Sequence, residues 1–472
     1  MANASPGKLT RQQLYDRIRE SSKDAYILEE MIRLGFWASE EERKKAQDIP
    51  VEELNRRRDD LQKQLRELYA KKRTFEDPEK ALKEMHKQRM AEARQRREET
   101  KQRREQQRLQ RHEQWMQRRD QEILYLGDGV SKELNKHDSD FQRLRTQTLP
   151  ELNDAVSLAR AMGISLSDLR FLSYHRKVST VSHYRRFTIP KKTGGERLIS
   201  APMPRLKNAQ YWILENILKP ITVHDAAHGF INQRSIKSNA NPHVGQPIVI
   251  NMDLENFFPT IAYPRVKGMF KAMGYSRQIA SILALLCTEP DIDQVDMDLR
   301  EFFVAAGQRK LPQGAPTSPA ITNIICRRLD KRLQGAVQNL GFEYTRYADD
   351  LTFSCNAGEE NRLKKLLWIV KKIINEEGFT VNDKKSRIMR HAARKEVTGI
   401  VVNDKLSVAR KTLKKFRALL YQIEKDGPTG KHWGHGGNLM RSIEGYANFI
   451  AMVDPEKGAG FVQQVRNIRN KW

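Results

Sequence analysis

Two adjacent aspartates, Asp349 and Asp350, lie inside the decapeptide YTRYADDLTF, whose aromatic, Thr and Leu residues favour a buried β-hairpin. Two like charges in a buried position repel each other and lose hydration, which raises the free energy of their charged forms. A divalent cation offsets both effects, because carboxylate oxygens are the hard ligands that such ions prefer. The pair therefore predicts a cation site at the tip of a hairpin, for which the rest of the chain must supply further ligands.

A third carboxylate, Asp253, lies at the end of PIVINMDL, residues 247–254. This run of apolar and β-branched residues is typical of a buried strand. An aspartate that ends an apolar strand is often only a turn residue, so Asp253 alone does not identify a site. Beside the hairpin, however, strand-borne carboxylates can hold two Mg²⁺ ions about 3.5–4 Å apart, which is the arrangement for in-line phosphoryl chemistry.

The surrounding sequence predicts mixed helices and strands that would position these residues. Two short amphipathic helices are expected in residues 149–175, with Ser165 or Ser167 as a cap. Residues 184–202 alternate between apolar and polar and contain Gly194-Gly195, which predicts a hairpin. A helix over residues 205–218 should follow, and the tail from Ala409 is helical and basic.

The composition indicates a nucleic-acid partner. The 472 residues carry a formal net charge of +26, and the pI is about 9.9. Such an excess of one sign destabilises the compact state by self-repulsion unless a polyanion neutralises it. Nucleic acid is therefore the leading partner, and an anionic membrane surface is the weaker alternative.

Other compositional features point to a reducing cytoplasm. The chain lacks a run of about 18 apolar residues, and its start, MANASPGKLT, has no signal-peptide core. Cys287, Cys326 and Cys355 are too widely spaced for a disulfide framework or a zinc site. We therefore expect a cytoplasmic protein without a membrane span.

The first 125 residues or so predict long helices with little core. Residues 87–119 contain twelve Lys or Arg and five acidic residues, so this segment carries a net charge of +7. A helix that is polar on all sides is either a solvated spacer or lies on a charged partner such as RNA, and both remain open. Upstream, the spacing of Leu54, Leu61, Leu65 and Leu68 predicts an amphipathic helix within a small helical unit of residues 8–75.

Four blocks give the chain a resemblance to a known family. MDLENFFPTI, LPQGAPTSPAITN, YTRYADDLTFS and GFTVNDKKS occur in the order and spacing of the palm of reverse transcriptases, and IPKKTGGERLISAP resembles the fingers hairpin. The resemblance covers roughly residues 150–470. Within that family, NANPH (Asn239 to His243) and VTG (Val397 to Gly399) are similar to two blocks of bacterial retron reverse transcriptases. Diversity-generating and abortive-infection polymerases share the palm but are not expected to carry both blocks.

The resemblance implies roles for individual residues. Asp253, Asp349 and Asp350 match the catalytic, metal-binding aspartates, and Phe258 matches the aromatic gate below the sugar of the incoming nucleotide. The nucleotide-binding residues that it implies are Lys191, Lys192, Arg197, Phe258, Gln313 and Gly314. The RNA-binding residues that it implies are Asn239, His243, Lys385, Val397, Thr398, Gly399, Lys411 and Lys414. Asn239 and His243 are expected to be RNA or structural contacts rather than catalysts, and a lone histidine is more often a satisfied structural group than a ligand.

The expected fold is an α+β right-hand polymerase with fingers, palm and thumb. Residues 1–130 form a helical, basic extension, residues 149–404 the fingers and palm, and residues 405–472 a helical thumb. By resemblance, the chain is an RNA-directed DNA polymerase that uses Mg²⁺ and deoxynucleoside triphosphates. It would copy part of its own structured non-coding RNA, and a 2′-hydroxyl of a guanosine in that RNA would serve as the primer. The branched RNA–DNA product would act with an effector protein in antiphage defence. The alternative is an RNA-binding scaffold with a degenerate palm.

Overall fold

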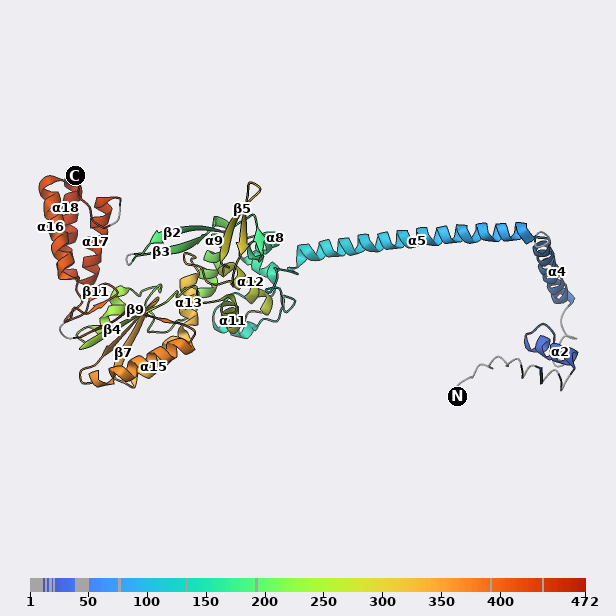
Figure 1. Ribbon diagram of the computed structural model, residues 1–472, viewed down its shortest axis with the longest axis horizontal. Coiled ribbons are helices and arrows are strands. Elements are labelled where there is room, and N and C mark those ends of the chain that lie inside the picture. The colour runs from blue at the N-terminus through green and yellow to red at the C-terminus, as the bar shows by residue number, and fades with distance from the viewer. Residues whose placement is uncertain are drawn as a thin grey trace. The chain divides into compact units, whose positions relative to one another are not determined.

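A computed structural model of the chain describes residues 12, 15–16, 19, 22–38, 51–74, 78–132, 134–191, 194–390, 393–434 and 437–472 (Figure 1). The chain divides into two compact units, Met1–His112 and Glu113–Trp472.

The helices are α2 (Lys23–Arg33), α4 (Val51–Thr74), α5 (Pro78–Gln121), α6 (Phe141–Thr146), α7 (Ala155–Ala161), α8 (Leu166–Ser173), α9 (Pro204–Ile213), η2 (Leu214–Leu218), α10 (Ile236–Ala240), η3 (Asn241–His243), α11 (Tyr263–Met273), α12 (Arg277–Cys287), α13 (Ser318–Ile325), α14 (Arg327–Gln338), η4 (Glu360–Arg362), α15 (Leu363–Glu376), α16 (Arg410–Asp426), α17 (Leu439–Val453) and α18 (Pro455–Lys471). The strands are β1 (Val178–Ser179), β2 (Tyr184–Pro190), β3 (Glu196–Pro202), β4 (Ile248–Leu254), β5 (Ile292–Met297), β6 (Arg300–Ala305), β7 (Phe342–Tyr347), β8 (Asp350–Cys355), β9 (Val381–Met389), β10 (Glu396–Val397) and β11 (Ile400–Val401).

The unit Met1–His112 is helical and has no buried apolar side chain among its described residues. The four leucines that the sequence aligns along α4 are 47% to 61% exposed. Both α4 and α5 are rich in Glu, Gln, Lys and Arg, which are good helix formers, and pairs one turn apart such as Gln95 and Glu99 (3.0 Å) add support. The predicted helical unit of residues 8–75 falls partly outside the described residues.

A four-stranded antiparallel sheet with the order β7-β8-β4-β9 forms the centre of Glu113–Trp472. The predicted strand over residues 247–254 is β4, and the predicted hairpin of YTRYADDLTF is β7 and β8, so both predictions are confirmed. Side chains of β4 enter two cores: Ile250 and Met252 pack in the larger one with α12 and α15, and Val249 packs in a second core. The central strands are apolar because both of their faces are covered.

The β2–β3 hairpin stands beside this sheet, and the predicted turn at Gly194-Gly195 is confirmed. Its register runs from Tyr184 opposite Pro202 to Pro190 opposite Glu196. The chain then enters α9, which begins with Pro204 because a proline at the first helical position loses no internal hydrogen bond. A separate three-stranded sheet has the order β1-β6-β5.

Helices α16, α17 and α18 (red in Figure 1) form a C-terminal bundle around the second core. The ring centroid of Phe416 lies 4.9 Å from those of both Trp433 and Tyr446. The same core contains Val249 of β4 and Val397 of β10, so the bundle packs on the sheet face opposite α15. Within the described residues, no helix combines the length and apolarity that crossing a membrane requires.

Candidate active site

One end of the four-stranded sheet brings the three predicted aspartates together. Asp253, near the end of β4, is paired in register with Asp350, the first residue of β8. Asp349 occupies the turn before β8, and the backbone N–H of Leu254 donates to the Asp349 carbonyl at 3.0 Å. Because residues paired across neighbouring strands have Cβ atoms about 4.5–5.5 Å apart, Asp253 and Asp350 share one small site.

The turn that carries Asp349 is held from its outer side. Ala348 has a left-handed φ of 58°, which is unusual for a residue with a Cβ atom. The segment after Ala226 packs directly against this turn: Arg346 N donates to Ala226 O and His228 N donates to Arg346 O, both at 2.7 Å. A Cβ atom on Gly229 would lie 2.7 Å from Ala348 N, so only glycine permits this approach.

The aspartates perturb one another electrostatically. Burial and the charges of Asp349 and Asp253 raise the pKa of Asp350 to about 6. Burial also raises the pKa of Asp349, while the nearby cations Lys385 and Arg197 oppose this rise. The Lys385 ammonium lies 3.1 Å and 3.0 Å from the two carboxylate oxygens of Asp253. The protein's own cations therefore neutralise the three carboxylates only in part.

The donor set suits a divalent cation that shares its coordination with a substrate. Among the described residues, no group of three or more His, Cys, Asp or Glu side chains is already arranged to hold a metal ion by itself. Mg²⁺ commonly takes one or two protein carboxylates and leaves its other positions to phosphates and water. Crowded carboxylates fit such an ion, and the raised pKa values of Asp349 and Asp350 agree with it, because its charge would stabilise their ionised forms.

Asp253 and Asp349 line a cleft of about 1360 Å³, whereas Asp350 does not. The β2–β3 hairpin forms another wall of the cleft through Lys191 and Arg197. Further lining comes from residues 254–259, 289–293 and 310–314. The predicted nucleotide-binding residues thus line one cavity together with Asp253 and Asp349, except for Lys192, which lies outside the described residues.

The two phenylalanines after β4 have different environments. Phe257 is 3% exposed, and its ring centroid lies 5.6 Å from that of Phe379 in the larger core. Phe258 is only partly buried, and both rings contribute to the cleft wall. Phe258 is therefore the ring that is more accessible to a bound molecule.

Gln313 and Gly314 pack against the β2–β3 hairpin. The backbone N–H of Ser200 donates to the Gln313 carbonyl at 2.7 Å. Gly314 has a φ of +118°, and a Cβ atom there would lie 2.9 Å from Ile199 and 3.0 Å from the Ser200 carbonyl oxygen. Glycine is required at this position because β3 approaches so closely.

The sequence analysis did not predict a buried charge cluster that contacts the turn before Asp349. The guanidinium of Arg346 donates to Asp330 in a bidentate pair, with Nε–Oδ1 and Nη2–Oδ2 distances of 2.8 and 2.7 Å. Both side chains are fully buried. Arg346 Nη1 also donates to Asn323 Oδ1 at 2.9 Å and to the Ala348 carbonyl at 3.2 Å. The pair thereby contacts the backbone of the turn that carries Asp349.

A sequence signal for this cluster does exist. Asp330 lies on the apolar stripe of α14, three and seven residues before Leu333 and Val337, both of which are buried. Arg346 lies in β7 (FEYTRY), a strand in which most side chains are buried. An acid on a core-facing helix stripe and a base in a buried strand each require a partner, and pairing them satisfies both.

The structure contradicts the expectation that Asn239 and His243 contact RNA, because both side chains are fully buried. The His243 ring bridges β8 and β7: its Nδ1 lies 2.7 Å from Ser354 Oγ, and its Nε2 lies 2.8 Å from Thr345 Oγ1. Burial lowers the pKa of His243 to about 3, so the imidazole is neutral. Asn239 Nδ2 donates to Thr398 Oγ1 at 3.5 Å, which brings the NANPH and VTG blocks into contact.

The VTG block forms the turn between β10 and β11. Val397 is fully buried in the second core, which also excludes its side chain from RNA contact. Thr398 is partly buried, and Gly399 is exposed. Lys411 and Lys414 are exposed on α16, and neither lines the cleft. The two motif blocks therefore join the sheet to the C-terminal bundle.

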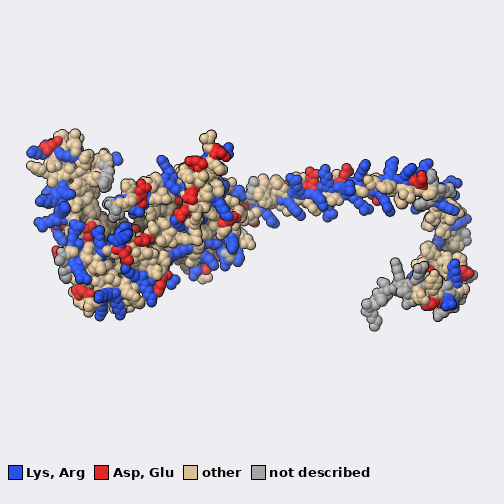
Figure 2. Space-filling model, viewed as in Figure 1, with Lys and Arg blue, Asp and Glu red and all other residues tan. Residues whose placement is uncertain are grey.

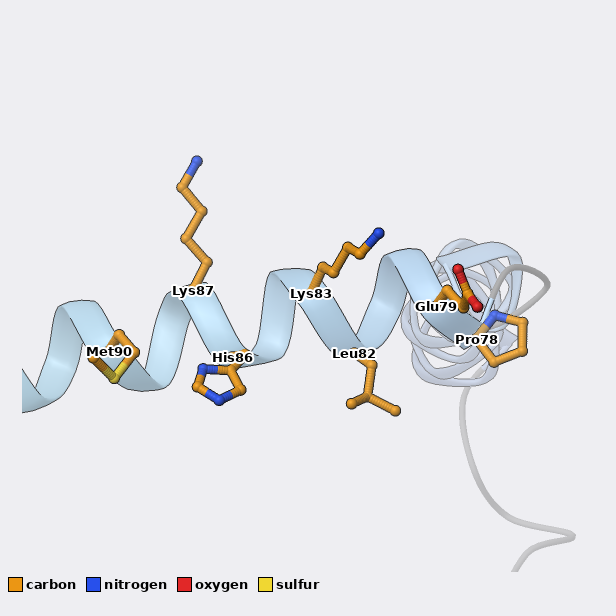
Figure 3. A pocket seen from close by; sticks show the side chains of 7 residues that line it. All are labelled: Pro78, Glu79, Leu82, Lys83, His86, Lys87 and Met90. Atoms are coloured by element: carbon orange, nitrogen blue, oxygen red, sulfur yellow. The ribbon is translucent and has the colours of Figure 1, made fainter.

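A second concavity lies on α5 alone and differs in kind from the cleft. In Figure 3, Leu82, His86 and Met90 project from one side of the helix and Lys83 and Lys87 from another. Every lining residue belongs to this one helix, in Pro78–Gln121. It brings together no group of side chains suited to catalysis.

Comparison with known proteins gives the site its context. Residues 189–416 match the family described as reverse transcriptase (RNA-dependent DNA polymerase). The chain is 40% identical over 343 residues to the retron Mx162 reverse transcriptase of Myxococcus xanthus, which covers 70% of each protein. It is 33% identical over 333 residues to the retron Ec86 reverse transcriptase of Escherichia coli, covering 70% of this chain and 94% of that protein.

Among solved structures, a telomerase from Candida albicans in complex with a fragment of telomeric RNA aligns with a TM-score of 0.36 and 12% identity. The alignment covers 59% of this chain and 56% of that one. This likeness is too weak to support a conclusion.

Proposed function

Because the chain belongs to the bacterial retron reverse transcriptases and is an RNA-directed DNA polymerase, we propose that it performs DNA synthesis in the cleft that Asp253 and Asp349 line. The observation that carries this proposal is the pairing of Asp253 with Asp350, which places three carboxylates at one end of the sheet. The cations Arg197 and Lys385 lie close enough to act on these charges.

Reverse transcriptases use divalent metal ions, and we propose Mg²⁺ as the ion for this site. Asp253 and Asp349 would hold it directly, while Asp350, which does not line the cleft, would support them from behind. When bound, the ions would stabilise the attacking and leaving oxygens of an in-line displacement. The raised pKa values of Asp349 and Asp350 support this assignment, because a cation would relieve the repulsion that contributes to them.

On the hairpin side, Arg197 and Lys191 would bind the triphosphate, since both line the cleft and carry positive charge. Phe258 would contact the sugar and exclude a 2′-hydroxyl. Gln313 and Gly314 would support the template and nucleotide from the loop that packs on β3. Lys385, 3.0 Å from an Asp253 oxygen, would lie near the primer end.

At the level of domains, we propose that the β2–β3 hairpin belongs to the fingers, the four-stranded sheet to the palm and α16–α18 to the thumb. Residues 149–404 and 405–472 would correspond to these parts, and residues 1–130 to a basic helical extension. Lys411 and Lys414, exposed on α16, would contact nucleic acid, as would Thr398 and Gly399 in the turn between β10 and β11. The template would be a structured non-coding RNA primed from a guanosine 2′-hydroxyl, and the branched product would act with an effector protein in antiphage defence.

The test compares wild-type protein with Asp253→Asn and Asp349→Asn in a primer-extension assay on a short RNA template. Each substitution removes one formal charge and changes the side-chain volume little. We expect both variants to lose DNA synthesis and to retain affinity for RNA. Undiminished synthesis by either variant would overturn the site assignment, and an inactive wild-type protein that still binds RNA would favour a scaffold role.

A further inference from the structure

The outer face of α15 carries a regular arrangement of lysines around one tryptophan. The inner face is apolar and lies in the larger core, with Leu366 and Val370 fully buried. Two lysines precede the tryptophan by about one helical turn, and two follow it at the same spacing, so all five share one side of the helix. This lysine–tryptophan face consists of Lys364, Lys365, Trp368, Lys371 and Lys372, all of which are exposed.

Trp368 is 65% exposed, although its large apolar ring would be expected to be mostly buried. The Lys372 ammonium lies 5.2 Å from the ring centroid, within the range of a cation–π contact. An exposed aromatic ring beside cations is the arrangement with which proteins stack an unpaired base and contact the adjoining phosphates. The ring is therefore available for a ligand that has a planar face and negative charge.

The positive charge of this face is only weakly neutralised within the protein. Lys371 donates to Asp383 at 2.7 Å, but both side chains are about half exposed or more, and such surface pairs contribute little. Lys364 and Lys365 have no carboxylate within ion-pair distance in the part of the chain that the structure describes. Figure 2 shows Lys and Arg side chains gathered over α15.

The neighbouring helix α14 extends the basic surface. It packs against α15, and three of its basic side chains are exposed: Arg327, Arg328 and Lys331. Arg328 pairs with Glu377 at 3.1 Å, whereas Arg327 and Lys331 have no acidic partner among the described residues. The excess positive charge thus covers two adjacent helices.

From these observations we propose that the lysine–tryptophan face binds RNA, with a base stacked on Trp368 and phosphates at the flanking lysines. A membrane surface fits less well, because a helix that lies in a lipid interface inserts its apolar face. In α15 that face is occupied by the protein core. Charge complementarity and one exposed ring favour RNA that has at least one unpaired base.

This RNA contact lies apart from the catalytic cleft. No residue that lines the cleft belongs to α14 or α15. The inference rests on the proposed function in one respect: the enzyme's RNA is folded and larger than the segment in the cleft. The face would hold a part of that RNA that is not being copied.

The experiment uses the full chain and the RNA that copurifies with it, end-labelled. One variant replaces all four lysines of the face by glutamine, and another is Trp368→Ala. A charge-matched control replaces four scattered exposed lysines by glutamine, namely Lys177, Lys207, Lys219 and Lys271. The ring control is Tyr211→Ala, because Tyr211 is 44% exposed and has Lys207 at 5.9 Å but lacks flanking lysine pairs.

We expect the four-lysine variant to bind the labelled RNA at least tenfold more weakly than its control at low salt. The slope of log affinity against log salt should fall by about 0.7 to 0.9 for each lysine that contacts a phosphate. Trp368→Ala should weaken binding about 5- to 100-fold with little change in slope, since stacking releases no counterions. Extension of a DNA primer on a short RNA template should be unchanged in both variants.

Binding of both variants at the level of their controls would overturn the proposal. So would a parallel loss of short-template extension, because it would mean that the cleft or the fold had changed. Reduced binding to phosphatidylserine vesicles with unchanged RNA binding would assign the face to lipid instead. If the wild-type protein fails to extend any primer but the RNA losses occur, the proposed polymerase site fails while this RNA surface stands.

Discussion

The buried pair of Asp330 and Arg346 should contribute both to stability and to the position of Asp349. Both side chains have no exposed surface, and the guanidinium makes four hydrogen bonds within the protein. Tyr344 adds a fifth contact by donating to Asp330 Oδ1 at 2.8 Å. Burial alone would lower the pKa of Arg346, but the charge of Asp330 holds that pKa above its ordinary value.

Asp330→Asn keeps the shape of the side chain and leaves the charge of Arg346 buried without a counter-charge. Breaking a buried ion pair in this way costs about 3–5 kcal/mol of folding free energy. That is a large part of the roughly 5–15 kcal/mol that stabilises a typical domain. The double variant with Asp330→Leu and Arg346→Met removes both charges. Its loss of folding free energy should be smaller than the summed losses of the two single variants by at least about 2 kcal/mol.

Activity should not recover together with stability in the double variant. Arg346 Nη1 donates to the Ala348 carbonyl at 3.2 Å, and methionine cannot replace this hydrogen bond. The turn before Asp349 would lose a fixed contact, so turnover should remain low under conditions in which the protein is folded. Urea unfolding gives the free energies, and primer extension at saturating substrate gives the turnover.

The matched control is the surface pair of Arg145 and Glu151, which is also bidentate, at 2.6 and 2.9 Å, but has side chains that are 70% and 40% exposed. Glu151→Gln should cost less than about 1 kcal/mol, because solvent screens such pairs. If Asp330→Asn costs no more than Glu151→Gln, the reasoning from burial is refuted. A fully active double variant would refute the positioning role of Arg346.

Three further expectations concern the site and its support. Phe258→Ala should relax discrimination against ribonucleotides, which a misincorporation assay measures. Phe257→Ala should leave that discrimination unchanged and lower the free energy of unfolding by about 3–5 kcal/mol in urea, because Phe257 is only 3% exposed. The pKa of Asp350 is raised to about 6, so its charged form prevails only above that pH. The affinity for Mg²⁺, measured by calorimetry, should therefore weaken between pH 8 and pH 6 in the wild-type protein, and this weakening should be smaller in Asp350→Asn. His243→Ala should cost about 2–4 kcal/mol through a cavity and lost strand-bridging hydrogen bonds, while the RNA affinity of the folded protein stays the same.

The local elements could be predicted from the sequence because their signals are local. The aromatic, Thr and Leu residues of the aspartate hairpin and the β-branched run before Asp253 lead directly to β7, β8 and β4. The expected cap is also found, since Ser165 accepts from the backbone N–H of Asp168 at 3.0 Å. The resemblance grouped Asp253, Asp349 and Asp350 as metal-binding residues, but the pairing of Asp253 with Asp350 depends on strand register, which periodicity alone does not determine.

What the sequence did not reveal are contacts between distant elements. For Asn239 and His243, the sequence left RNA contact and a structural role both open. In the structure their partners lie in two strands and a turn that are 102, 111 and 159 residues away along the chain. Hydrogen bonds inside the protein make the burial of these polar side chains possible. Neither the composition nor the hydrophobic periodicity of the sequence indicates which partners form them.

Strands β7 and β8, which flank Asp349, are supported on both sides by side-chain contacts. Arg346 on β7 reaches the turn carbonyl before Asp349 from within the larger core. His243 joins Thr345 of β7 to Ser354 of β8 at 2.8 and 2.7 Å, next to the second core that the C-terminal bundle completes. Two crowded carboxylates raise the free energy of the turn that carries them, so that turn stays in place only if its strands are fixed elsewhere. The polar residues buried around β7 and β8 therefore hold the strands that flank Asp349 in place, and in the proposed site they would affect the chemistry only through the position of that carboxylate.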